Sequence, residues 1–70
     1  MKILLTEHME DRMKRRGLLI EEIMDVIKYP DAINKRHGKL FIRKRLVRGT
    51  VEVCCERIEN NIKILTVYWI

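Results

Sequence analysis

Hydrophobic residues follow two different spacings, and the change falls just after Pro30. Before it, apolar side chains recur every three or four positions, which predicts two amphipathic helices over about 7–16 and 19–28. Thr6 is placed to cap the first helix and Gly17 to end it. The apolar stripes comprise Met9 and Met13 in the first helix and Ile20, Ile23, Met24 and Ile27 in the second.

After Asp31 apolar and polar residues alternate, which predicts strands. We expect strands over 32–36, 40–47, 50–58 and 62–70, with turns at His37-Gly38-Lys39, Arg48-Gly49 and Asn60-Asn61. Residues 3–5 are apolar and either pair or enter the core. The pattern therefore predicts an α+β fold, with an N-terminal helical hairpin packed on a C-terminal three- to four-stranded antiparallel sheet.

The alternation also predicts which strand residues face the helices. One consistent assembly places Leu40, Ile42, Val51, Val53, Leu65, Val67 and Trp69 on the inner face. The outer face then carries Phe41, Arg43, Arg45, Glu52, Glu56, Thr66 and Tyr68. The last strand is apolar on both sides, so either of its faces can be the inner one.

The chain length of 70 residues provides for one small domain, and we expect residues 1–70 to form it. No apolar run approaches the ~18 residues of a membrane span, and the apolar start is too short for a signal peptide. We therefore expect a cytoplasmic protein without a membrane partner. The sequence contains no Ser, which excludes a serine nucleophile.

Cys54 and Cys55 are adjacent, so in a strand they point to opposite faces and do not readily form a disulfide with each other. We expect one buried and one at least half-exposed thiol. A zinc site would need both cysteines together with His8 and His37, without a Cys-x-x-Cys spacing. No metal or other cofactor is therefore expected.

Positive charge is concentrated in one quarter of the chain. Residues 32–48 hold seven of the fifteen Lys and Arg and no acid, although the whole chain carries only +5. Such a local excess attracts polyanions, of which nucleic acid is the commonest. The same charge also suits a solvated hairpin or an acidic protein partner. The candidates for RNA binding are Lys35, Arg36, Lys39, Lys44 and Arg48.

Several motifs resemble one small protein family. The segments are Thr6-Glu7-His8-Met9-x-x-Arg12-Met13-x-x-Arg16-Gly17-Leu18, Pro30-Asp31, Thr50-Val51-Glu52-Val53 and Ile64-Leu65-Thr66-Val67-Tyr68. Together they resemble the domain-of-unknown-function family numbered 4258 over nearly the whole chain. Two departures are Met9 in place of the usual Ala, and Leu19 where a helix-capping Ser or Thr is common.

That family in turn resembles the ribonuclease superfamily of RelE-type and BrnT-type toxins and colicin-type tRNA nucleases. The resemblance implies helices packed on a four-stranded antiparallel sheet and RNA cleavage without a metal ion. It also implies that the catalytic residues are drawn from His, Lys, Arg, Tyr and Thr. Because fold alone does not fix function, the activity stays a prediction.

Metal-free RNA cleavage needs a base, an acid and cations that stabilise the phosphorane. His8 can be the base or acid, and Arg12, one helical turn away, can bind phosphate. Arg43 and Arg45 can grip the scissile phosphate. Thr66 and Tyr68 can bond phosphate or stack a base. The catalytic candidates are His8, Arg12, Arg43, Arg45, Thr66 and Tyr68.

Each candidate also has an ordinary structural interpretation. His8 equally suits a histidine that bonds a backbone carbonyl, Thr66 is a good strand residue, and Tyr68 suits a core aromatic with a wet edge. Three functions therefore remain open. They are a toxin-like endoribonuclease with RNA and an acidic antitoxin as partners, a non-catalytic RNA- or protein-binding module, and a homodimeric structural protein.

Overall fold

Both predicted helices and all four predicted strands form, close to the expected bounds. A computed structural model describes residues 2–70. In it, α1 spans Glu7–Arg15 and α2 spans Ile20–Lys28. The strands after them are β2 (Ala32–Arg36), β3 (Lys39–Leu46), β4 (Gly49–Ile58) and β5 (Asn61–Trp69). The α+β class is confirmed.

The sheet differs from the prediction because it has five strands and is mixed. Residues Ile3–Leu4 form β1, which pairs in parallel with β5 and gives the order β1-β5-β4-β3-β2. The backbone N–H of Ile62 donates to the carbonyl of Lys2 at 2.8 Å. The expectation of three to four antiparallel strands was therefore wrong, because the short apolar start of the chain pairs along the free edge of β5.

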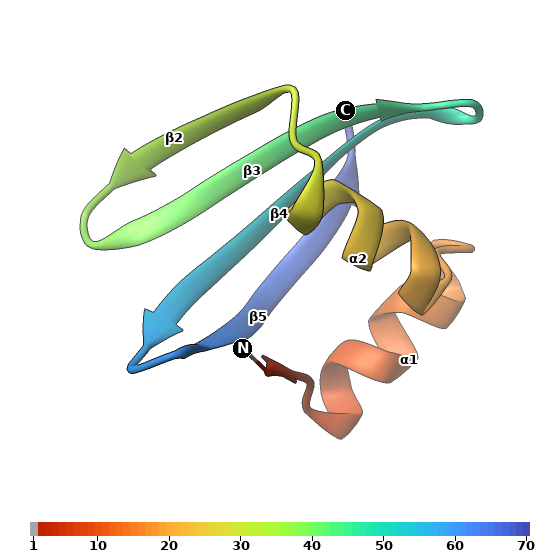
Figure 1. Cartoon of the computed structure of the whole chain (residues 1–70). Coiled ribbons are helices and arrows are strands. Elements are labelled where there is room, and N and C mark those ends of the chain that lie inside the picture. Colours follow the sequence, from red (N-terminus) through yellow and green to blue (C-terminus); the bar gives the residue numbers. More distant parts are fainter. Residues whose placement is uncertain (1) are drawn as a thin grey trace.

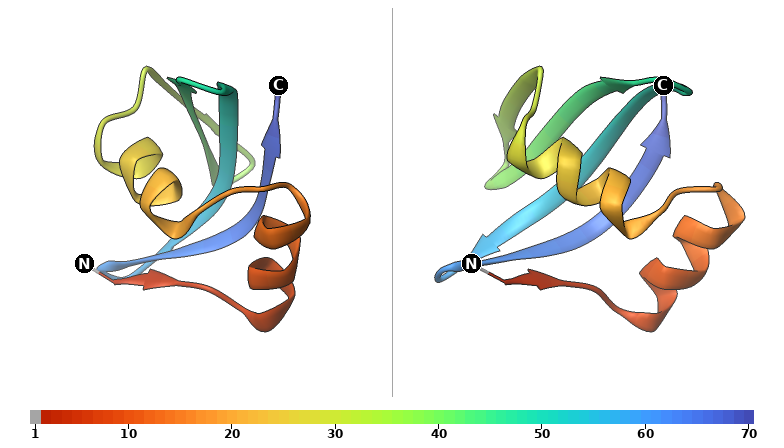
Figure 2. Two further views of the ribbon diagram at one scale, coloured as in Figure 1. Left: turned by 90° about the vertical axis from the view of Figure 1, so that its right-hand side faces the viewer. Right: turned by 45° about the vertical axis from the view of Figure 1, so that its right-hand side comes forward.

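The two helices do not pack together as a hairpin, contrary to the prediction. Figure 1 shows α2 lying across the sheet, where it contacts β3 and β4, whereas α1 contacts β5. Figure 2 shows α1 beside the β5 end of the sheet and apart from α2. Specific bonds hold α1 there: Arg16 donates to the Val67 carbonyl at 2.6 Å, and the Trp69 indole donates to the Arg16 carbonyl at 2.8 Å.

The ends of α1 follow from its predicted capping residues. Thr6 Oγ1 accepts a hydrogen bond from the Met9 backbone N–H at 3.2 Å. At the other end Gly17 adopts a φ of +65°, and the Leu18 N–H reaches back to the Met13 carbonyl at 2.8 Å. This is a Schellman ending, which also turns Leu18 into the core.

α2 starts without a capping side chain at Leu19, and Glu22 compensates in part. The Leu19 N–H donates to Glu22 Oε1 at 3.0 Å, which satisfies one orphan donor. The same carboxylate also pairs with Arg48 from the β3–β4 turn. These two bonds together lower the pKa of Glu22 against the opposing effect of its burial.

The core lies between the sheet and the inner sides of both helices. The predicted inner-face residues contribute as expected, except Leu65, whose place is taken by Ile64. The reason is an irregularity in the β4–β5 pairing. Cys54 pairs with Thr66 but Cys55 pairs with Ile64, so Leu65 has no partner on β4 and the alternation changes phase there. The buried core residues are Met9, Met13, Leu18, Ile23, Val26, Ile42, Val51, Val53, Cys55, Ile62, Ile64 and Val67.

Both cysteines are buried, which corrects the expectation that one would be at least half-exposed. Cys55 belongs to the core and Cys54 lies on the opposite face of the sheet with an exposed fraction of only 6%. Cys54 is enclosed because Phe41 and Thr66 flank it on the neighbouring strands. Both thiols are free. Within residues 2–70, neither helix is long and apolar enough to cross a membrane.

Candidate active site on the open face of the sheet

The candidate site lies on the sheet face that α2 leaves uncovered, which we call the open face. Strand register arranges its residues in two rows. Phe41 pairs with Cys54, and Cys54 pairs with Thr66; Arg43 pairs with Glu52, and Glu52 pairs with Tyr68. Neighbouring strands are about 5 Å apart, and residues two apart on a strand are about 7 Å apart. The two rows are therefore adjacent.

Arg12 connects α1 to the first row. Its Nη1 donates to Thr66 Oγ1 at 3.1 Å, and its Nη2 lies 3.0 Å from His8 Nε2. A guanidinium can only donate, so the imidazole nitrogen is the acceptor in this contact. The Thr66 hydroxyl keeps its own proton free to donate. Three of the predicted catalytic residues thus form one hydrogen-bonded series.

Two features of the fold bring this series together. His8 and Arg12 lie one turn apart on the side of α1 next to its buried Met9 and Met13 stripe. Arg16 holds the last turn of that helix to the edge of β5 through the Val67 carbonyl. The arginine side chain at position 12 is consequently held half-buried beside Thr66.

In the second row, the Glu52 carboxylate connects Tyr68 and Arg43. Glu52 has an exposed fraction of 5%, accepts a hydrogen bond from the Tyr68 hydroxyl, and forms an ion pair with Arg43 at 3.2 Å. A buried carboxylate needs such partners, because an unpaired charge there would be costly. Arg43 remains about half-exposed, so its other donors face solvent. Glu52 therefore fixes Tyr68 and leaves Arg43 partly free for an anion.

Electrostatics on this face keep the tyrosine and the cysteine protonated near neutral pH. The hydrogen bond to Glu52, followed by burial, raises the pKa of Tyr68 to about 12. Burial raises the pKa of Cys54, although the nearby cations Lys39 and Arg36 act in the opposite direction. Tyr68 is thus a hydroxyl donor rather than a base, and Cys54 is not a ready nucleophile.

A cation and an aromatic ring meet at the β2–β3 end of the open face. The Arg36 guanidinium carbon lies 4.5 Å from the centre of the Phe41 ring. This distance is within the range of a cation–π contact. Lys39 lies beside them, opposite Arg36 in the β2–β3 pairing.

The other predicted residues divide between the two faces. Arg45 shares the outward register of Arg43 next to Thr50, and its backbone N–H bonds to Asp31 at 2.8 Å. Arg36 and Lys39 also lie on the open face. The remaining cations face the helix side of the sheet or its end. Lys35 pairs with the inward Leu40, Lys44 donates to the Tyr29 carbonyl at 2.7 Å, and Arg48 donates to the Gly17 carbonyl at 2.6 Å.

The structure therefore places most of the predicted catalytic residues in two neighbouring groups, His8, Arg12 and Thr66 in one, and Tyr68 and Arg43 in the other. Lys35, Lys44 and Arg48 lie away from both groups. The candidate site residues taken from the sequence lacked two residues that hold the others in place. Glu52 is the hub of the second row and Phe41 supports Arg36. The sequence shows Glu52 as an acid between Val51 and Val53, in a position that faces outward. Its role depends on its pairing with Arg43 and Tyr68, which the sequence does not state.

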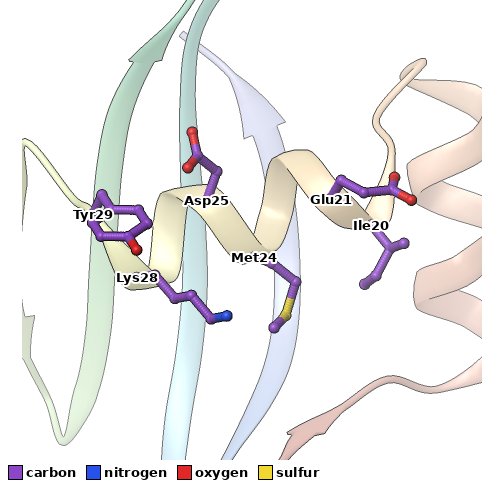
Figure 3. A pocket seen from close by; sticks show the side chains of 6 residues that line it. All are labelled: Ile20, Glu21, Met24, Asp25, Lys28 and Tyr29. Atoms are coloured by element: carbon purple, nitrogen blue, oxygen red, sulfur yellow. The ribbon is translucent and has the colours of Figure 1, made fainter.

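A separate hollow runs along the outer side of α2. Figure 3 shows its six side chains, and the helix lies in front of the sheet, so the hollow belongs to the helix side. It is lined by Ile20, Glu21, Met24, Asp25, Lys28 and Tyr29. It shares no residue with the open face and contains no histidine or cysteine.

Within residues 2–70, no group of three or more His, Cys, Asp or Glu side chains is arranged to hold a metal ion. Comparison with known families gives one match. The model of a domain of unknown function, DUF4258, matches residues 5–69. No curated protein matches the chain significantly. No solved structure does so either.

Proposed function

The chain belongs to the DUF4258 family of domains of unknown function, and from its open face we propose a small metal-independent endoribonuclease that cleaves RNA by acid–base chemistry. The observation that carries this proposal is the double engagement of Arg12. One guanidinium contacts both a histidine and a threonine hydroxyl, at the border of a basic sheet face. This combination offers a base and two phosphate-binding groups at one point.

In the proposed reaction a phosphodiester binds to Arg12 and the Thr66 hydroxyl and displaces the guanidinium from His8. His8 Nε2 then removes the proton of the 2′-hydroxyl, whose oxygen attacks phosphorus. Negative charge grows on the phosphoryl oxygens, where Arg12 and the solvent-facing donors of Arg43 stabilise it. The bond to the 5′-oxygen breaks and a 2′,3′-cyclic phosphate remains.

The departing 5′-oxygen takes its proton from Tyr68, whose hydroxyl turns from Glu52 to the leaving oxygen in this step. This residue lies two positions from Thr66 on the same strand face, about 7 Å further along β5 and away from the first row. A phenol with a pKa of about 12 stays protonated at neutral pH, and it can still protonate an alkoxide, which is the stronger base. The proton on His8 returns to the phenolate through solvent and restores both groups.

RNA is the partner that this reaction requires. The open face owes its positive charge to strand residues and to Arg12 from α1, opposed by Glu52 and Glu56. The strand cations are Arg36, Lys39, Arg43, Arg45 and Lys63. An acidic antitoxin protein is our proposed second partner, because an acidic surface would cover the same cations. The charge distribution supports both proposals without distinguishing them.

The test is RNA cleavage by the purified protein in excess chelator. We expect products with 2′,3′-cyclic phosphate ends, and a loss of at least ~100-fold in His8→Ala and Arg12→Lys. His37→Asn is the matched control, because it removes the other histidine from a turn where Asn tolerates the φ of +53°. Salt-sensitive RNA binding without cleavage would refute the proposed enzyme and favour a non-catalytic binding module. Loss of cleavage on chelation would refute the metal-free mechanism.

A further inference from the structure

Arg36 and Phe41 form a cation–π pair in which the guanidinium lies over the ring and is itself exposed to solvent. Phe41 is half-buried in the sheet, and Arg36 lies over its ring on the exposed strand β2. No acidic side chain among residues 2–70 forms an ion pair with Arg36. The guanidinium therefore lies over the ring on one side and is open to solvent on the other.

The pair lies at a defined distance from the candidate phosphate site. Phe41 is in the same row as Thr66, with Cys54 between them. Two strand spacings make about 10 Å across the sheet. A nucleotide whose phosphate rests on Arg12 and Thr66 can extend along this row and bring an adjacent base to Arg36.

Only an unpaired base can use such a surface. RNA-binding sheets recognise bases by stacking them on aromatic rings or on arginine planes, and the bases of a duplex are not available for this. Lys39 adds positive charge beside the pair for the RNA backbone. The flat, charged surface, with an aromatic ring under it, suits a nucleobase better than it suits a peptide side chain.

We propose that Arg36 and Phe41 form a stacking platform for an unpaired nucleobase next to the scissile phosphate, so that the substrate is single-stranded RNA. Phe41 holds the guanidinium over its ring, and the base stacks on the side of the guanidinium that faces solvent. This inference rests on the proposed ribonuclease function and names its substrate class. Because stacking does not need the chemistry of His8, it can be measured without cleavage.

The experiment uses a single-stranded 2′-O-methyl oligoribonucleotide that contains 2-aminopurine, whose fluorescence falls when the base stacks. The 2′-O-methyl groups prevent cleavage. We expect the native protein to quench the fluorescence. We expect Phe41→Leu and Arg36→Lys to reduce the quenching and to weaken binding roughly 5- to 100-fold, which is the effect of losing one stacked base.

Arg36→Lys keeps the positive charge and replaces the planar guanidinium by an ammonium group. Arg36 is exposed, so the change does not disturb the core. Lys35→Ala is the matched control, because it removes one charge from the opposite side of the same strand. Binding without quenching in the native protein would overturn the platform. Equal affinity for single-stranded and duplex RNA, or equal losses in Lys35→Ala and Arg36→Lys, would also overturn it.

These results separate the two proposals. Quenching by a protein that never cleaves natural RNA would retain the platform as a binding site and refute the nuclease. Cleavage by a protein that shows no quenching would retain the nuclease and refute the platform.

Discussion

Tyr68 donates its hydroxyl hydrogen to Glu52, a carboxylate that is almost wholly buried in the open face of the sheet. The two residues oppose each other on β5 and β4, and Arg43 approaches the same carboxylate from β3. One acid thus fixes an aromatic hydroxyl and a cation on two other strands. This arrangement determines how the candidate site responds to pH and to mutation.

The first prediction concerns the ionisation of Tyr68. The hydrogen bond to Glu52 is the largest cause that raises the pKa of Tyr68 to about 12, and the charge of Glu52 adds to it. Glu52→Gln weakens that bond and removes the charge, so we expect the pKa to move back toward 10. Ultraviolet titration of the phenolate measures it in a Tyr29→Phe background, which leaves a single tyrosine. An unchanged titration curve would show that burial, and not Glu52, keeps Tyr68 protonated.

The same pKa predicts a loss of stability in alkali. The pKa of Tyr68 in the folded protein lies above its unfolded value of 10. Its contribution is therefore complete below pH 10 and is lost as the pH rises through 12. Chemical denaturation at pH 9 and pH 11 should show this decline, and Tyr68→Phe should reduce it. A decline of the same size in Tyr68→Phe would assign it to other groups, such as Cys55, whose pKa burial raises to about 11.

Arg16 is predicted to stabilise the docking of α1. Its bond to the Val67 carbonyl is charge-assisted, and such bonds contribute about 1.5–3 kcal/mol. We expect Arg16→Ala to lower the free energy of unfolding by that amount and to reduce any RNA cleavage, because His8 and Arg12 lie on the same helix. Arg15→Ala, at the exposed neighbouring position, is the control and should be nearly neutral. Equal effects of the two changes would contradict the anchoring role.

A capping side chain at position 19 is predicted to stabilise the N-terminus of α2. Leu19 occupies the N-cap position without an acceptor, and its exposed fraction is 61%. Leu19→Ser supplies the missing oxygen, and we expect it to exceed Leu19→Ala in the free energy of unfolding by about 1 kcal/mol. Thermal or urea unfolding provides the comparison. If the two variants had equal stability, the bond from the Glu22 backbone N–H to the carbonyl of residue 19 would already satisfy the donor that Ser would cap.

Both cysteines are predicted to resist alkylation in the folded protein. Cys55 is fully buried and Cys54 nearly so, and burial raises the pKa of each thiol. Because the thiolate is the reactive form, iodoacetamide near pH 8 should modify neither residue until the chain is unfolded. Mass spectrometry after alkylation with and without urea distinguishes the two states. Rapid modification of Cys54 without urea would show that the flanking Phe41 and Thr66 side chains move aside readily.

The elements of this fold are predictable because local patterns specify them. Thr6 caps α1 through its side-chain oxygen, Gly17 ends it through a positive φ, and the alternation after Asp31 gives β2 to β5. Relationships over long distances in the sequence are not specified in this way. The parallel pairing of Ile3 with Ile62 and the change of phase at Leu65 depend on how distant strands align.

The candidate site shows the same division. His8 and Arg12 are one helical turn apart, so their proximity could be predicted from spacing alone. The meeting of Arg12 with Thr66 required the docking of α1 on β5, and the role of Glu52 required the register of three strands. Lys44 and Arg48 carried the same positive charge as Arg43, and only the structure separates the faces on which they lie.

The pairing of β1 with β5 also sets an order for folding during synthesis. A ribosome makes Ile3 and α1 before their partners in the sheet, which belong to residues 61–69. Contacts between such distant segments form slowly, because a long loop must close first. The His8–Arg12–Thr66 series therefore cannot assemble on a nascent chain that lacks β5. The proposed ribonuclease therefore stays inactive until β5 has left the ribosome.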